Sequence, residues 1–138
     1  MNESSIQIKY IAPEGRFKPP GYSEAVSVEG PHHTVYIGGQ NATADDGSIV
    51  GVGDLAAQTE QALRNIDAVM KAAGGTLDDI VKWTVYLVQG QDPQVGFAAY
   101  QRAVGQLKHA PAVTVVFVAG LGRPEWLVEI EAIAVVPQ

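Results

Sequence analysis

The sequence contains no cysteine, no run of basic residues and no apolar stretch long enough to span a bilayer. Without cysteine the chain can form no disulfide, no thiol nucleophile and no thiolate metal site. A formal net charge of −6 argues against a nucleic-acid partner, because such proteins concentrate lysine and arginine to neutralise phosphates. The longest apolar-rich stretch, residues 110–121, is far shorter than the roughly 20 residues that cross a membrane. We therefore expect neither a nucleic-acid nor a membrane partner.

Size and composition favour one folded domain. The chain has 138 residues, of which 46% are hydrophobic and 17% are charged, as in an ordinary globular protein. We expect a single domain over residues 1–138, in which residues 1–19 form an N-terminal strand and loop. The first ten residues lack a basic start followed by an apolar core, so they do not read as a signal peptide. A cytoplasmic location is expected.

Hydrophobic periodicity predicts two helices among six strands. Apolar residues recur at three- and four-residue intervals from Leu55 to Ala73, which predicts a long amphipathic helix capped by Asp54 and ended by Gly74 and Gly75. Asp92 and Pro93 open a second helix, with proline at its first position. Strands are predicted at 6–11, 22–28, 34–39, 80–89, 112–119 and 127–135. The strands at 22–28 and 34–39, separated by a short turn at 29–31, are expected to pair as a hairpin.

The element order is thus β-β-β-α-β-α-β-β, an α+β chain. Two strand–helix–strand units imply right-handed crossovers, which place both helices on one face of a single mixed sheet. Residues 113–118 are mainly apolar on both sides, so this strand is expected to be central and buried on both faces. The sheet face opposite the helices then needs a cover, and oligomerisation supplies it most economically.

The terminal strand, residues 127–135, carries the most informative pattern. Alternate residues of a strand point to opposite faces. One face is wholly apolar, whereas the other carries Glu129 and Glu131 in an apolar row. The two glutamates either face water from an edge strand, or line a pocket or subunit contact where a carboxylate serves chemistry. For Glu131 the alternative is a structural ion pair with Lys82 or an arginine.

Several segments, together covering most of the chain from about residue 20 to residue 136, resemble one family. They are Pro20-Gly21-Tyr22-Ser23-Glu24-Ala25, Ile37-Gly38-Gly39-Gln40, 58–65 leading into Ala72-Ala73-Gly74, Asp79-Ile80-Val81-Lys82, and 129–135. They resemble the Rid family, the YjgF-type reactive-intermediate deaminases. The resemblance implies a chorismate-mutase-like (YjgF-like) fold and a homotrimer, with the open sheet face in the subunit contacts and small-molecule pockets in the clefts between subunits. Family members hydrolyse enamines and imines to ketoacids and ammonia, and no cofactor is expected.

The resemblance also identifies candidate site residues and departures from the family pattern. Tyr22 matches the family's pocket tyrosine and Glu129 its pocket glutamate, here the candidate general base. Val113 stands where the family has the arginine that holds a substrate carboxylate by two parallel hydrogen bonds, which valine cannot imitate. Further departures give Val115 for a small polar residue, Gly38 for a serine and Phe97 for an asparagine. The expected substrate-binding residues are Tyr22, Gly38, Phe97, Val113 and Val115.

These substitutions predict a more apolar pocket and leave two hypotheses. The first is a Rid-like hydrolase that acts on a small imine, enamine or related intermediate without an amino-acid-derived carboxylate, with Glu129 activating water. The second is a trimer that binds a metabolite or a partner protein in the same cleft without chemistry. Ribonuclease activity, sometimes attached to this family, conflicts with the acidic balance. Arg123 is either a replacement cation for the pocket or an exposed turn residue. The three histidines lack carboxylates at ligand spacing, so no metal site is predicted.

Overall fold

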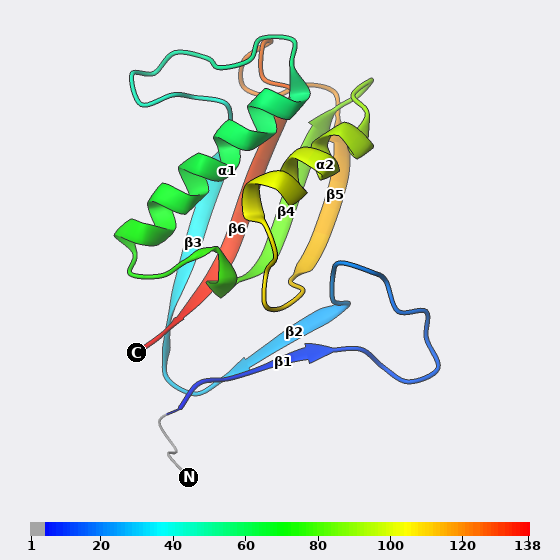
Figure 1. The fold of residues 1–138 in the computed structure, drawn as a ribbon, viewed down its shortest axis with the longest axis vertical. Coiled ribbons are helices and arrows are strands. Elements are labelled where there is room, and N and C mark those ends of the chain that lie inside the picture. Colours follow the sequence, from blue (N-terminus) through cyan, green and yellow to red (C-terminus); the bar gives the residue numbers. More distant parts are fainter. Residues whose placement is uncertain (1–4) are drawn as a thin grey trace.

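The computed structural model describes residues 5–138, and residues 1–4 of the expected domain lie outside this part. A mixed four-stranded sheet has the order β3-β6-β4-β5, and both helices cover one of its faces (Figure 1). The elements are β1 (Gln7–Ile11), β2 (Ala25–Glu29), β3 (His32–Gln40), α1 (Leu55–Ala72), a 3-10 turn (Leu77–Asp79), β4 (Ile80–Val88), α2 (Pro93–Val104), β5 (Ala112–Val118) and β6 (Val128–Pro137). The α+β fold and the order predicted from the sequence are confirmed.

The N-terminal strands differ from the expected single sheet. β1 and β2 pair antiparallel as a separate two-stranded sheet, whereas β3 pairs antiparallel with β6. The predicted hairpin of β2 with β3 is therefore wrong. Only Gly30 and Pro31 separate the two strands, and a type I′ turn would need a positive φ at both positions, which proline cannot adopt. The chain instead passes from one sheet to the other at this point.

The two-stranded sheet is attached to the start of β5. The ring of Tyr10 in β1 stacks on His109, with centroids 4.7 Å apart. Ser23 forms two hydrogen bonds with the segment before β5, from its backbone N to Pro111 O at 3.0 Å and from its Oγ to Ala110 O at 2.6 Å. These contacts fix the loop between β1 and β2 beside the open edge of the main sheet.

The last two strands occupy the opposite positions in the sheet from those expected. The sequence predicted a central β5 and allowed an edge position for β6. β5 pairs only with β4 in the main sheet and is an edge strand, and Val115, Val116 and Phe117 are between 37% and 50% exposed. The prediction that both faces of β5 are buried is therefore wrong for the single chain. β6 lies inside the sheet between β3 and β4, so the edge-strand interpretation of its glutamates is wrong as well.

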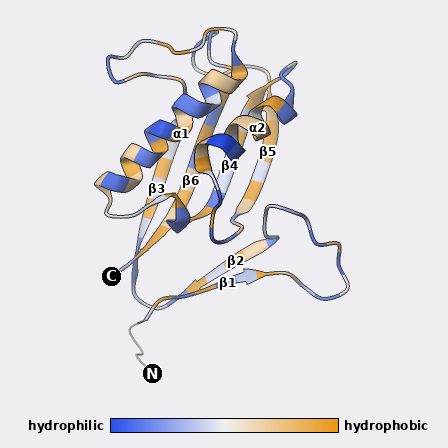
Figure 2. Cartoon of the chain, in the orientation of Figure 1, coloured by the Kyte–Doolittle hydropathy of each residue, from blue (hydrophilic) through white to orange (hydrophobic). Residues whose placement is uncertain are grey.

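The core lies between the sheet and α1. Three residues of α1, Leu63, Ile66 and Met70, are buried in one cluster with Ile130, Ala132 and Ala134 of β6. Orange apolar bands run along the strands of the main sheet behind α1 in Figure 2. Polar residues occupy the outer side of α1, as its amphipathic pattern predicts (Figure 2). Among the described residues, no helix is both long and apolar enough to cross a membrane.

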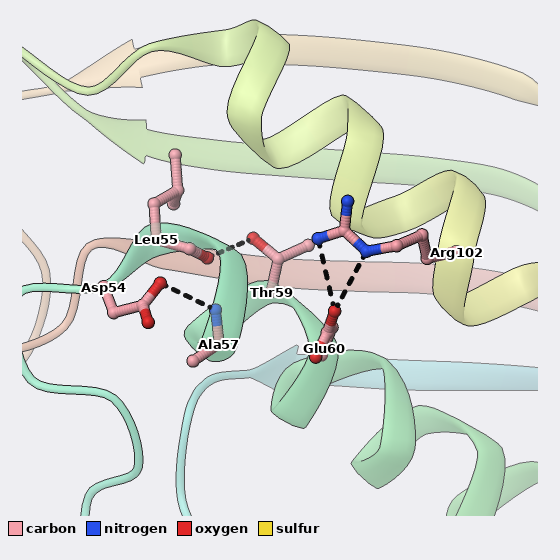
Figure 3. A network of polar contacts seen from close by, with 6 residues as sticks. All are labelled: Asp54, Leu55, Ala57, Thr59, Glu60 and Arg102. Carbon is pink, nitrogen blue, oxygen red and sulfur yellow. Dashed lines mark hydrogen bonds and ion pairs between the residues drawn. The ribbon is translucent and has the colours of Figure 1, made fainter.

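Polar contacts, most of them buried, hold α1 in place at its first turns. Asp54 caps the helix through Ala57 N, and the Thr59 hydroxyl donates to Leu55 O at 2.8 Å (Figure 3). Gln58 is fully buried; its Nε2 donates to Gly51 O and Glu125 O at 3.1 and 2.9 Å, and its Oε1 accepts from Leu127 N at 2.9 Å. This one side chain therefore ties α1 both to the loop before it and to the loop that leads into β6.

A surface ion pair links the two helices. The Arg102 guanidinium of α2 donates to Glu60 of α1 at 3.3 and 3.4 Å (Figure 3). Exposed pairs of this kind contribute little free energy, because water screens both charges. The position of α2 therefore depends mainly on its apolar contacts with the core. Other apolar residues of α2 line the pocket described next.

Candidate functional site

An apolar pocket of about 330 Å³ lies beneath α2, against β4 and β5. Its walls are formed by residues from the helix face of the sheet, from both helices and from the loop before β2. The lining residues are Pro20, Gly21, Tyr22, Thr59, Trp83, Val85, Leu87, Pro93, Gly96, Phe97, Tyr100, Val113, Val115, Val128 and Ile130. None of these side chains carries a charge.

Strand alternation and the start of α2 explain how the sequence builds this pocket. Trp83 and Val85 of β4 are in register with Val113 and Val115 of β5, so their side chains form neighbouring rows on the helix face. Asp92 caps α2 through Gln94 N at 2.9 Å. The first turns of α2 then lie over these two strands (Figure 1). Pro93, Gly96 and Phe97 from these turns line the pocket.

Trp83 and Tyr100 bring polar groups to an otherwise apolar wall. The two rings meet edge to face, with centroids 5.8 Å apart. Trp83 is 1% exposed, and its Nε1 is shielded from solvent beside Tyr100. Burial raises the pKa of Tyr100 to about 12, and a side-chain hydrogen bond with the Trp83 indole acts more weakly in the opposite direction.

Four of the six residues singled out from the sequence line this pocket. Phe97 comes from α2, Val113 and Val115 come from β5, and Tyr22 comes from the loop held by Ser23. Val113, which the resemblance matches to the family arginine, is part of an apolar wall here. Arg123, weighed as a substitute cation, is not among the lining residues and lies 6.0 Å from the centre of the Trp126 ring.

Glu129 points away from this pocket. Its neighbours Val128 and Ile130 face the helices and line the pocket, so strand alternation puts Glu129 on the open face of the sheet. Its Oε1 accepts a hydrogen bond from Asn41 Nδ2 at 3.3 Å. Gly38, the remaining candidate, lies in β3 and is likewise not among the residues that line the pocket. Within one chain the candidate base and the candidate pocket are on opposite sides of the sheet.

The surroundings of Glu129 depend on a missing side chain in β3. A Cβ built on Gly39 would lie 2.7 Å from Cδ and 2.9 Å from Cγ of Glu129. Only glycine leaves room for this carboxylate against the backbone of β3. The β-bulge between Ile37 and Gln40 accompanies this close approach.

A short polar network behind Glu129 was not found from the sequence. Asn65 of α1 donates from Nδ2 to Asn41 O at 3.0 Å and to Thr43 O at 2.9 Å. Asn41 in turn donates to Glu129, so α1 fixes the loop that holds the carboxylate. Residues 41–53 are polar and glycine-rich, which is the composition of an ordinary surface loop. The one signal available was Asn65, an amide on a helix whose inward residues are mostly apolar.

Glu131 does not form the ion pair that was considered for it. The Tyr86 hydroxyl donates to Glu131 Oε1, and this hydrogen bond is the main reason that the pKa of Tyr86 is raised. Lys82 donates instead to the hydroxyl of Thr114 on β5. The open face of β4 and β6 therefore carries two carboxylates, of which one is held by a phenol and the other by an amide.

The fold and the pocket define an α+β protein with one sheet, two covering helices and a ligand-sized cavity. A family model described as endoribonuclease L-PSP matches residues 16–136. A RutC family protein of Pyrococcus horikoshii is 37% identical over 125 residues, which are 90% of this chain and 94% of that protein. A 2-iminobutanoate/2-iminopropanoate deaminase of Mus musculus is 36% identical over 115 residues, 83% of this chain and 80% of that protein.

A solved structure agrees with these matches. A protein of unknown function of the conserved Rid family, from Yersinia pestis, superposes with a TM-score of 0.78 at 34% identity, covering 92% of this chain and 97% of that one. The chain belongs to the family described as endoribonuclease L-PSP, and within it to the Rid and RutC proteins. The resemblance stated from the sequence is confirmed.

Proposed function

We propose that this chain is a Rid-type deaminase that hydrolyses a small, uncharged imine or enamine in a cleft between two copies of itself. The mouse relative, named as an iminobutanoate and iminopropanoate deaminase, supports the reaction class. The carrying observation is that Glu129 and the apolar pocket lie on opposite sides of one sheet. A site that contains both needs a pocket from one copy and a carboxylate from another, as a cyclic homotrimer would supply.

In such a cleft the two halves have separate tasks. The pocket beneath α2 holds the apolar part of the substrate and excludes bulk water from it. Glu129 accepts a proton from a water molecule as that water attacks the C=N carbon, and returns a proton to the nitrogen. Glu129 then takes the hydroxyl proton of the resulting carbinolamine and passes it to the nitrogen as the C–N bond breaks, so that imine and water give a carbonyl compound and ammonia.

The pocket residues favour a substrate without a carboxylate. Val113 supplies no cation, and burying a carboxylate among uncharged side chains without a partner is costly. The expected substrates are imines freshly formed from simple amines by an amine oxidase. Imines formed from amino acids by an amino-acid oxidase should be poor substrates. A Val113→Arg variant should reverse this preference, since a guanidinium binds a carboxylate bidentately.

The decisive experiment mixes two inactive variants. Glu129→Gln lacks the base, and Val115→Trp fills the pocket. In co-expressed mixed oligomers, about one quarter of the clefts combine an intact pocket with an intact glutamate, since each half is drawn independently from the two variants. Imine hydrolysis should then recover to about a quarter of the wild-type rate. If the mixture shows only the sum of the two separate activities, the site does not lie between copies.

The same assay separates catalysis from binding alone. If the wild-type protein accelerates the hydrolysis of neither the amine-derived nor the amino-acid-derived imines, the deaminase proposal is wrong. Saturable ligand binding without ammonia release would then support the non-catalytic trimer that the sequence also allowed.

A further inference from the structure

The pocket beneath α2 has a buried end and an open mouth, and both are apolar. At the buried end, Trp83 and Ile130 are 1% and 2% exposed. Tyr22, Phe97 and Val115 also line the pocket, but they are between 43% and 54% exposed and therefore lie at its mouth. Apolar side chains thus surround a ligand from the sheet outward to the mouth.

The polar side chains at the buried end are already engaged within the protein. The Thr59 hydroxyl donates to Leu55 O at 2.8 Å. The Trp83 indole and the Tyr100 side chain form a hydrogen bond with each other. A polar atom of a ligand at this end would give up its hydrogen bonds to water for a wall whose polar groups are already paired, which is costly. The buried end therefore favours a group without hydrogen-bonding atoms.

The volume of the pocket sets the size of that group. A cavity of about 150 Å³ is enough to hold benzene, and the pocket of about 330 Å³ is roughly twice as large. It has room for a ring with a short chain, or for a branched alkyl group, of about seven to ten carbon atoms. A group of two or three carbon atoms would bury much less apolar surface, and each missing methylene costs about fourfold in affinity.

The position of Glu129 decides which end of the substrate enters the pocket. Within one chain this carboxylate lies on the opposite face of the sheet from the pocket. In the proposed cleft it therefore belongs to another copy and meets the substrate only at the mouth. The C=N group has to stay at the mouth, while the substituent on the imine carbon points inward toward Trp83. This substituent is the part of the substrate that the pocket selects.

We propose that the substrate is an imine whose carbon carries a bulky hydrocarbon group, aryl-alkyl or branched alkyl, with no polar atom at its far end. This inference rests on the proposed function for the C=N group and its hydrolysis. Binding of the hydrocarbon group does not depend on Glu129, because that side chain is on the other face of the sheet.

Three neutral amides test the binding, because an amide resists hydrolysis and stands in for the C=N group at the mouth. Phenylacetamide carries the expected ring, its para-hydroxy derivative adds a polar atom at the far end, and propionamide has only a short chain. Calorimetric titration of the full-length protein should show that phenylacetamide binds at least about tenfold more tightly than either of the others. The hydroxyl loses its bonds to water at the buried end, and the short chain buries too little surface.

Two matched variants assign the binding to this pocket. Val115→Phe narrows the mouth at a half-exposed position and should weaken phenylacetamide binding at least about tenfold, while propionamide binding changes little. Val52→Phe makes the same substitution at an exposed loop position outside the pocket and should leave both affinities unchanged.

The corresponding imines test the substrate itself. They are generated in the assay by an amine oxidase from phenethylamine, tyramine and propylamine, which have the same three end groups. The value of kcat/KM should be at least about tenfold higher for the phenethylamine imine than for the other two. In Val115→Phe the preference over the propylamine imine should disappear.

Equal affinity for phenylacetamide and its hydroxy derivative, or phenylacetamide binding that Val115→Phe leaves unchanged, would overturn the inference. Repeating the titrations with Glu129→Gln separates it from the deaminase proposal, since the order of affinities should be the same in this variant. If phenylacetamide binds as expected but no imine is hydrolysed, only the proposed reaction fails. If all three imines are hydrolysed equally well, only the inference about the substrate fails.

Discussion

Replacing Gly39 by alanine should remove most of the activity while leaving the protein folded. The added Cβ would stand 2.7 Å from Cδ and 2.9 Å from Cγ of Glu129. Carbon atoms in ordinary contact are about 3.5–4.0 Å apart, so the carboxyl group must retreat by about 1 Å. The retreat also stretches the hydrogen bond from Asn41, which is already 3.3 Å long.

The expected loss is large because catalysis depends on position. A displacement of about 1 Å at a reacting group can cost about 100-fold in rate. The free energy of unfolding should change by less than about 0.5 kcal/mol, since the atoms displaced are the end of a flexible side chain. The signature is therefore a fall in kcat with a nearly unchanged urea midpoint and KM.

The control is Gly120→Ala. A Cβ at Gly120 meets no described atom within 4 Å, and the residue is in the loop after β5. Both variants are assayed for ammonia release from the best imine, beside Glu129→Gln. If Gly39→Ala turns over like Gly120→Ala while Glu129→Gln is inactive, the position of this carboxylate against β3 does not matter and the reasoning is wrong.

Two further predictions concern stability. Gln58→Met keeps most of the buried volume but removes three hydrogen bonds. At about 1 kcal/mol per bond, the free energy of unfolding measured in urea should fall by about 3 kcal/mol. A loss below about 1 kcal/mol would contradict the role given to this side chain. Burial raises the pKa of Tyr100 to about 12 from the ordinary 10.0, so the folded state holds the phenol proton more tightly than the unfolded state does. The resulting contribution to the free energy of unfolding is complete below pH 10 and falls as the pH rises to about 12. Thermal unfolding across this range should show a shallower decline in Tyr100→Phe than in the wild type, and parallel curves would contradict it.

Local structure was predictable because its signals are local. The stripe of apolar residues, the Asp54 cap and the terminal glycines placed α1 within one residue of its observed ends. Such periodicities depend only on neighbours within about two turns, and tertiary contacts did not override them here.

Strand pairing was less predictable, because it depends on partners far along the chain. The short link at Gly30 and Pro31 favoured a hairpin, but β2 pairs with β1 and β3 with β6. Apolar residues on both sides of β5 suggested a central strand, yet β5 is at the edge. A strand that is exposed in one chain but covered in an assembly carries the sequence of a buried strand, so the two cannot be told apart from pattern alone.

The site residues came from the resemblance, and their grouping came from the structure. No periodicity relates Tyr22, Phe97 and Val113, which lie on three elements and meet only in the folded chain. The pattern of β6 showed that Glu129 and Val128 face opposite ways, but not which face meets the helices. Asn41 carried no signal, because an asparagine in a loop is ordinary.

The division of the site between two faces also has an energetic consequence. A carboxylate inside the pocket of a single chain would be desolvated without a partner, and folding would have to bear that cost. On the open face Glu129 keeps the Asn41 amide and its access to water while the chain folds. In the oligomer that we propose, the carboxylate comes to face an apolar pocket only when two copies associate. The free-energy cost of desolvating Glu129 is then offset by the free energy of association of the open face. On that face Tyr36 and Val116 are exposed and available for contact. Activity should therefore fall with dilution into the range where the oligomer dissociates, while the dissociated chains remain folded.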